Sequence, residues 1–284
     1  MKPDQDSLVG TSVIESEVIK YKKGREAERI SDSITVEEPL EIKLVIRGKE
    51  VVHSVVMRTP GHDLELALGL LYSDGIIGSI SDVDLHDNLH LNEEKNVIKI
   101  KITKPRSTVP RDPVPRFINS SCGLCGKASI DQLYLRIGST IRDRLTVSSD
   151  LILELPGILR DRQKTFRMTG GIHAAGAFTP DGLPLYIGED VGRHNAVDKV
   201  IGMLLLENDT GSGKIIQVSG RCGFEILQKS ALMGFPIVSA VSAPSSLAVQ
   251  TAEALGITVV GFNRTDGFNV YSHPERIIFR RDHG

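Results

Sequence analysis

The second half of the chain repeats one pattern, in which a short apolar run is followed by a stretch with helical periodicity. The apolar runs span 214–218, 236–240 and 258–262, and helical patterns follow the first two at 224–233 and 246–255. Short apolar strands that alternate with helices are typical of a largely parallel sheet with helices on both faces. The sequence therefore predicts an α/β domain in this half of the chain.

The first half of the chain shows a different pattern. Apolar and polar residues alternate from 41 to 57 on either side of a turn at 47–49, which predicts a β-hairpin. Apolar residues at helical spacing over 63–72 predict a helix, and renewed alternation over 97–102 predicts another strand. These elements indicate a small α+β unit.

Local composition divides the chain into three parts. The first thirty residues are polar and show no periodicity, so we expect a flexible N-terminal arm over 1–30. Residues 104–121 contain four prolines and four basic residues, which predicts a loop or linker and no regular element. We place the small α+β domain at 31–115 and the α/β domain, which carries the cysteine pair and a ligand pocket, at 116–284.

The overall composition excludes several classes of protein. The net charge is −2, from 34 basic and 36 acidic residues, so no overall field favours nucleic acid or a membrane as a partner. There is no tryptophan, and only 5% of residues are aromatic, which argues against a base-stacking surface. Without a long apolar run or a signal segment, and with only three cysteines, the sequence predicts a cytoplasmic protein in a reducing compartment.

The sharpest local motif is the cysteine pair Cys122 and Cys125, which lies between glycines and precedes Lys127. Backbone amides of a helix predicted from about residue 129, together with the charge of Lys127, would stabilise a thiolate. A thiolate attacks the sulfur of a persulfide or disulfide, and a second thiol three residues away can resolve or relay the product. The motif predicts sulfur transfer or redox exchange at these two catalytic cysteines.

Two other interpretations of this cysteine pair stay open. Zinc needs two further ligands, which Cys222 and one histidine would have to supply, because no second CxxC accompanies the pair; we predict no metal site. The pair could also be unreactive and shape a turn, although inert cysteines seldom lie between glycines and a lysine. A thioredoxin-like motif would follow an early strand of a βαβ unit, whereas this pair follows a proline-rich stretch.

Two further segments concentrate polar groups beside apolar elements. In 169–175 paired glycines precede His173, which either is a hydrogen-bonded structural residue or faces a ligand. In 189–199 Asp190 and Arg193 belong to a polar cluster at the start of a predicted helix. This cluster either caps the helix and pairs on its surface or lines the rim of a cavity.

Polar loops follow all three predicted parallel strands. Loops 219–223 and 242–246 each join a strand to a helix, and 261–267 ends the third strand. Ligands of open α/β sheets bind at the carboxyl ends of the strands, where free amides, hydroxyls and guanidinium groups can hold phosphate. We expect a mononucleotide-type pocket with Arg221 and Arg264 as phosphate partners. Neither GxGxxG nor the Walker A pattern is present, which disfavours ordinary NAD and ATP folds.

Four separated runs of the sequence together resemble the FdhD family of sulfur carriers, which are needed to make active formate dehydrogenase. The match extends in the same order from about Ser31 to the end of the chain. The runs are SSCGLCGKASI, TGGIHAAGAF, GEDVGRHNAVDKVIG and SGRCGFEILQKSALMGFPIVSAVSAPSSLAVQTAEALGITVVGFNR.

The resemblance implies a specific function and specific partners. A cysteine desulfurase would load sulfur as a persulfide onto Cys122, with Cys125 as its partner thiol. The sulfur would pass to the molybdenum bis(molybdopterin guanine dinucleotide) cofactor, which is then inserted into apo formate dehydrogenase. GDP would mimic the nucleotide part of that cofactor. The alternative function is a non-covalent chaperone for the cofactor, in which the cysteine pair is structural or binds metal.

The resemblance also implies a cofactor-binding segment, a fold and an oligomeric state. The expected fold is α/β, with a cytidine-deaminase-like three-layer large domain and a smaller α+β domain, and the expected assembly is a homodimer. Ala174 and Ala175 follow His173 where a deaminase has His-x-Glu, so deamination is not expected. With the strand-end loops included, the expected cofactor-binding residues are Phe262, Asn263, Arg264, Thr265, Asp266, Gly267, Arg221, His173 and Ser245.

Overall fold

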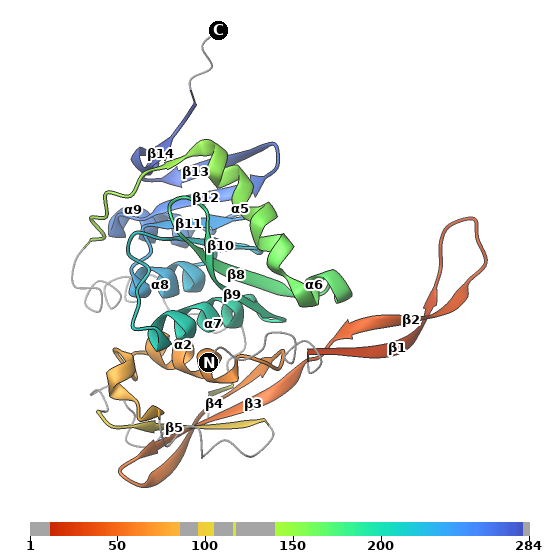
Figure 1. Cartoon of the computed structure of the whole chain (residues 1–284), viewed down its shortest axis with the longest axis horizontal. Helices are drawn as coiled ribbons and strands as arrows, with labels where there is room; N and C mark the ends of the chain where they lie inside the picture. Colours follow the sequence, from red (N-terminus) through yellow and green to blue (C-terminus); the bar gives the residue numbers. More distant parts are fainter. Residues whose placement is uncertain (1–11, 86–95, 105–115, 118–139, 281–284) are drawn as a thin grey trace.

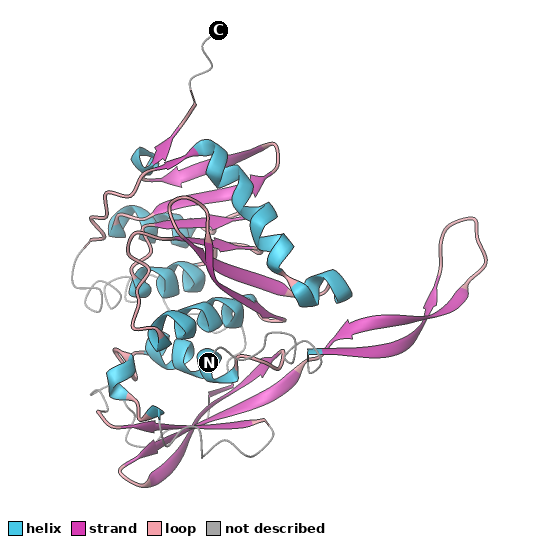
Figure 2. Ribbon diagram, in the orientation of Figure 1, coloured by secondary structure: helices cyan, strands magenta, loops and turns pink. Residues whose placement is uncertain are grey.

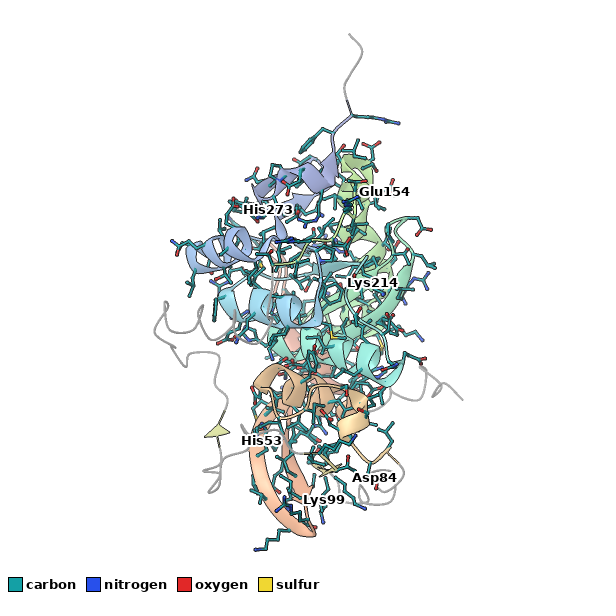
Figure 3. The ribbon with its side chains drawn as sticks, turned by 90° about the vertical axis from the view of Figure 1, so that its left-hand side faces the viewer. His53, Asp84, Lys99, Glu154, Lys214 and His273 are labelled. Atoms are coloured by element: carbon teal, nitrogen blue, oxygen red, sulfur yellow. The ribbon has the colours of Figure 1, made fainter. Side chains whose placement is uncertain are left out.

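The computed structural model describes residues 12–85, 96–104, 116–117 and 140–280. Two sheets lie on opposite sides of a group of stacked helices, and a two-stranded ribbon projects from this body (Figure 1). In the view turned by 90°, Lys99 marks the end of the body with the smaller sheet, and Glu154 marks the other end (Figure 3). No helix in the described ranges is both long and apolar enough to span a membrane.

The smaller sheet contains the predicted hairpin and has the strand order β5-β3-β4-β6. Its strands are β3 (Glu38–Ile46), β4 (Lys49–Arg58), β5 (Val97–Ile102) and β6 (Arg116–Phe117). Arg47 and Gly48 both have positive φ, 50° and 77°, which matches the twist of a two-residue hairpin turn. Helix α2 (Asp63–Asp74) ends at Gly75 in the left-handed conformation. The predicted hairpin, helix and strand are confirmed.

The larger sheet has six strands in the order β13-β12-β11-β10-β8-β9. They are β8 (His173–Phe178), β9 (Pro184–Asp190), β10 (Ile215–Val218), β11 (Ile237–Ala240), β12 (Thr258–Arg264) and β13 (Gly267–Ser272). Parallel pairing in this sheet is limited to β10, β11 and β12. The other three strands pair antiparallel with their neighbours, so the prediction of a largely parallel sheet is wrong for them. Short turns at 179–183 and 265–266 connect β8 to β9 and β12 to β13, and such turns produce antiparallel neighbours.

Helices cover both faces of the larger sheet (Figure 2). Helix α5 (Ser149–Arg162) packs with Ile215 on one face, and the adjacent Ile216 belongs to the core on the opposite face. The helices of that opposite face are α7 (Arg193–Leu206), α8 (Phe224–Met233) and α9 (Ser246–Leu255). The predicted α/β class and the apolar runs of the central strands are confirmed, whereas a specific likeness to cytidine deaminases stays a prediction.

The remaining elements are short and lie at the margins of these layers. They are α6 (Lys164–Thr169), the parallel pair β7 (Val147–Ser148) and β14 (Ile277–Ile278), and the single-turn helices η1 (Ile80–Asp82) and η2 (Pro274–Arg276).

Helices α2 and α7 connect the two sheets through a close backbone contact. A Cβ atom at Gly69 would overlap the carbonyl of Asp198, and one at Gly202 would overlap the carbonyl of Glu65. Residues of β3, α2 and α7 consequently belong to one continuous hydrophobic core. The core crosses the predicted domain boundary at 115/116, and the division into domains stays a prediction.

The projecting ribbon consists of β1 (Val13–Lys20) and β2 (Glu28–Thr35), paired antiparallel. From residue 13 onward the structure therefore differs from the expected flexible arm over 1–30. Both faces of the ribbon are largely exposed, so its sequence lacks the strong apolar alternation of a half-buried strand. Side chains also bridge the paired strands, since Glu15 accepts hydrogen bonds from Ser31 at 2.7 Å and Ser33 at 2.6 Å.

Candidate functional site

An open cleft of about 1250 Å³ lies at the carboxyl edge of the three parallel strands. Ser219 follows β10, Val241 follows β11, and Asn263, Arg264 and Thr265 come from the end of β12; all of them line this cleft. The strand-end loops therefore meet at one place, as the repeated strand-helix pattern predicts for a sheet of this class.

His173 joins the same cleft because β8 runs antiparallel to β10. The first residue of β8 consequently lies beside the end of β10. Ala174 N donates to Ser219 Oγ and Ser219 N donates to Ala174 O, each at 2.9 Å. One wall of the cleft is formed by α5. No sequence pattern distinguishes this wall, because a helix that lines a cleft has the same periodicity as any other covering helix.

The segment 262–267 forms one end of the cleft and its adjoining surface. Phe262 has a left-handed backbone, with φ 51°, and its ring is 39% exposed. The Arg264 guanidinium carbon lies 5.8 Å from the centre of that ring, within cation–π range. Thr265 and Asp266 form the turn into β13, and Gly267 pairs with Arg264 across it. The exposed ring and guanidinium can contact a ligand, whereas Asp266 and Gly267 complete the turn.

Arg221 and Ser245 do not line the cleft. Ser245 is the N-cap of α9, where its Oγ accepts a hydrogen bond from Ala248 N at 3.3 Å. The two strand-end loops bind each other, since Ser245 N donates to Cys222 O at 3.0 Å. Arg221 is exposed beside this contact. For Ser245 the geometry favours a capping role. Both residues were predicted to bind the ligand, and both lie outside the cleft wall.

A positively charged corner lies beside His173. Burial, then the positive charges of Arg193 and His194, lower the pKa of His173 below its usual value, so the ring is neutral at pH 7. Arg193 Nε is buried and has no hydrogen-bond partner among the described residues. A Cβ at Gly220 would lie 3.5 Å from His173 Nδ1 and 3.7 Å from Arg193 Cδ, which places both side chains against the same glycine. This corner suits an anion.

Asp190 has a structural role at the start of α7. Its carboxylate accepts from Gly192 N and Asn195 Nδ2, each at 2.9 Å. It also forms a fully buried ion pair with Lys199, with 2.8 Å between Oδ2 and Nζ. Asp190 is therefore structural, but it does not cap α7 as the first interpretation of segment 189–199 predicts, because the N-cap is Gly192 and has no side-chain cap hydrogen bond. Arg193 lies beside His173, which lines the cleft.

The pairing expected for Arg193 in the capping interpretation is not formed. The two carboxylates considered for it have other partners. Asp198 forms a buried ion pair with Lys229 at 2.7 Å, and Glu189 accepts from Thr165 N and Phe166 N at 3.0 Å each. Neither of these two carboxylates therefore neutralises Arg193, whose side chain lies beside His173.

The cysteines fall into two groups. Cys122 and Cys125, with the helix predicted from about residue 129, lie outside the described residues. Cys222 is fully buried, and burial raises its pKa to about 12. A thiol in that state is unreactive at neutral pH. In the described part of the chain, no three His, Cys, Asp or Glu side chains are grouped as metal ligands.

Known proteins with similar sequences share almost the whole length of this chain. Sulfur carrier protein FdhD of Thermoplasma volcanium is 45% identical over 258 residues, which is 87% of this chain and 90% of that protein. The protein of the same name from Saccharolobus solfataricus is 43% identical over 270 residues, which is 95% of this chain and all of that protein.

The fold also matches a solved structure. A protein from Desulfotalea psychrophila, described as a formate dehydrogenase accessory protein, superposes with a TM-score of 0.72 at 22% identity, over 94% of this chain and all of that one. The family model described as FdhD/NarQ matches residues 35–278. The chain belongs to the FdhD/NarQ family.

Proposed function

We propose that this protein carries sulfur from a cysteine desulfurase to the molybdenum bis(molybdopterin guanine dinucleotide) cofactor required by formate dehydrogenase. Family membership and relatives named as sulfur carriers support the sulfur-carrying role. The observation that carries the assignment is the cleft at the carboxyl edge of the sheet, which Arg264 and His173 line. The exposed Phe262 ring lies beside the Arg264 guanidinium, and Arg193 lies beside His173.

The sulfur chemistry requires two thiols and no metal. The Cys122 thiolate attacks the terminal sulfur of the desulfurase persulfide, which forms a Cys122 persulfide and releases the desulfurase thiolate. The Cys125 thiolate then attacks the inner sulfur of this persulfide. A Cys122–Cys125 disulfide forms, and the outer sulfur leaves as HS⁻ for the molybdenum of the bound cofactor. A cellular dithiol reduces the disulfide and restores both thiols.

The cleft would hold a guanine nucleotide half of the cofactor. Phe262 offers a flat face for the base, and Arg264 offers charge-assisted hydrogen bonds to phosphate. The corner formed by Arg193 and His173 would hold a second anionic group. The volume of about 1250 Å³ slightly exceeds the range of typical small-molecule sites, which suits a large dinucleotide cofactor.

Mass spectrometry tests the covalent step. After incubation with a cysteine desulfurase and cysteine, the peptide that contains Cys122 should gain the mass of one sulfur atom. Cys122→Ala should lose this adduct and the activation of formate dehydrogenase, whereas the control Cys222→Ala should retain both. An unmodified Cys122 peptide would refute the relay. Full activation by a protein lacking both Cys122 and Cys125 would instead support the non-covalent chaperone.

Calorimetric titration with GDP tests the cleft independently. Arg264→Ala should weaken GDP binding about tenfold or more, because a charge-assisted hydrogen bond contributes roughly 1.5–3 kcal/mol. Arg29→Ala removes an exposed arginine of β2, which belongs to the projecting ribbon (Figure 1) and does not line the cleft, and serves as the matched control. Equal affinity in the two variants would place the nucleotide elsewhere.

A further inference from the structure

Helix α5 contains a proline at an interior position that faces the cleft. Pro156 has no N–H, so the carbonyl of Ile152 four residues earlier lacks its usual helical donor. The pyrrolidine ring also crowds this carbonyl and tilts it away from the helix axis. A proline here is unfavourable for the helix, so the free carbonyl needs another partner.

Asn263 supplies that partner from the neighbouring sheet. Its Nδ2 donates to Ile152 O at 2.6 Å and to Ser239 Oγ at 2.9 Å. Asn263 is fully buried, so water cannot replace these bonds. The amide thereby ties the end of β12 to both α5 and β11.

The tie fixes an unusual backbone conformation at Phe262. A left-handed φ of 51° is unfavourable for an aromatic residue and persists only when its surroundings hold it. The register between β12 and β13 shifts between Gly261 and Arg264, which marks a bulge at this point. Asn263 faces inward while the side chains on either side of it, Phe262 and Arg264, are exposed, as alternation along a strand requires.

We propose that Pro156 is a positioning residue for the nucleotide-binding end of the cleft. By freeing the Ile152 carbonyl, it anchors Asn263, and this anchor places the Phe262 ring and the Arg264 guanidinium where a base and a phosphate can contact them. The inference rests on the proposed function of the cleft. Pro156 itself acts through Asn263 and needs no contact with the nucleotide.

The test replaces Pro156, because a change at Asn263 would remove its bonds to α5 and to β11 together. Pro156→Ala restores a helical donor to Ile152 O and draws the carbonyl back toward the helix axis. GDP binding, measured by calorimetry, should weaken about three- to tenfold, as expected for the loss of about one hydrogen bond. In the Asn263→Ala background the same change should cause no further loss, as in a double-mutant cycle.

A spectroscopic readout isolates the anchor from nucleotide binding. The side-chain amide protons of Asn263 should exchange slowly with solvent in the native protein and faster in Pro156→Ala, as observed by NMR. Ser239→Ala removes a second anchoring bond of Asn263 and should weaken GDP binding in the same direction, which keeps the test valid if Pro156→Ala fails to fold. Pro274→Ala at the start of η2 is the matched control and should leave affinity and exchange unchanged.

The outcomes separate the inference from the proposed function. Unchanged affinity and unchanged Asn263 exchange in Pro156→Ala would overturn the inference, as would an equal loss of affinity in the Asn263→Ala background. Absence of GDP binding by the native protein would refute the nucleotide role of the cleft and with it the positioning role of Pro156, whatever the exchange data show.

Discussion

Replacing Lys199 by methionine removes one partner of the buried ion pair at the junction of β9 and α7. Lys199 Nζ lies 2.8 Å from Asp190 Oδ2, and the two side chains are 1% and 0% exposed. Lys199 also donates to the carbonyls of Thr59 and Glu189, each at 2.9 Å. The variant leaves a buried carboxylate without its countercharge, and such a loss costs about 3–5 kcal/mol of unfolding free energy.

A surface pair of equal length is the control for this effect. Lys214 Nζ lies 2.8 Å from Asp209 Oδ1, but the side chains are 16% and 33% exposed, and Lys214 is labelled in Figure 3. Lys214→Met should cost less than about 1 kcal/mol. Urea unfolding at neutral pH measures the free energy of unfolding of both variants. The comparison requires that the slope of this free energy against urea concentration is the same in each. Similar losses in the two variants would refute burial as the cause.

Three further predictions follow from the packing and the charges. Gly69→Ala and Gly202→Ala should each destabilise the fold by at least about 1–3 kcal/mol in thermal unfolding, because α2 and α7 must separate. Gly157→Ala in α5 should instead stabilise the fold by up to about 1 kcal/mol, because a Cβ there meets nothing within 4 Å. Iodoacetamide should label Cys222 only as fast as the protein unfolds, and rapid labelling of the native state would contradict its burial. The pKa of His173 is lowered in the folded protein, so the unfolded chain binds a proton first as pH falls below about 6.5. The free energy of unfolding should therefore decrease below this pH. Between about pH 7 and pH 5, His173→Gln should lose less stability than the native protein.

Local sequence signals located several elements because capping and turn chemistry are local. Helices α8 and α9 have the bounds that their periodicity predicts, and left-handed Gly234 and Gly256 end them. The hairpin turn at Arg47 and Gly48 follows from the same kind of signal. The direction of β8 could not be predicted, because an apolar run reads the same in a parallel and an antiparallel strand.

The sequence could predict which loops lie at the carboxyl edge of the sheet, but not which of their side chains line the cleft. Arg264 and Thr265 were expected at the carboxyl edge because they end a parallel strand, and both line the cleft. Arg221 was expected there on the same ground, but the cleft wall contains Ser219 from that loop. Proximity of a loop to an edge does not determine which side chain faces the cleft. That choice depends on tertiary contacts, such as the bonds between Ser219 and Ala174.

Burial of the third cysteine sharpens the sulfur-transfer proposal. The chain has three cysteines, and Cys222 is enclosed in the core with a pKa of about 12. Its thiol is therefore unsuited to accept a persulfide or to resolve one at neutral pH. Any covalent relay in this protein must then use Cys122 and Cys125 alone. A persulfide that survives loss of both would have to form on a thiol that the fold has enclosed, so this double variant is the most stringent test of the relay.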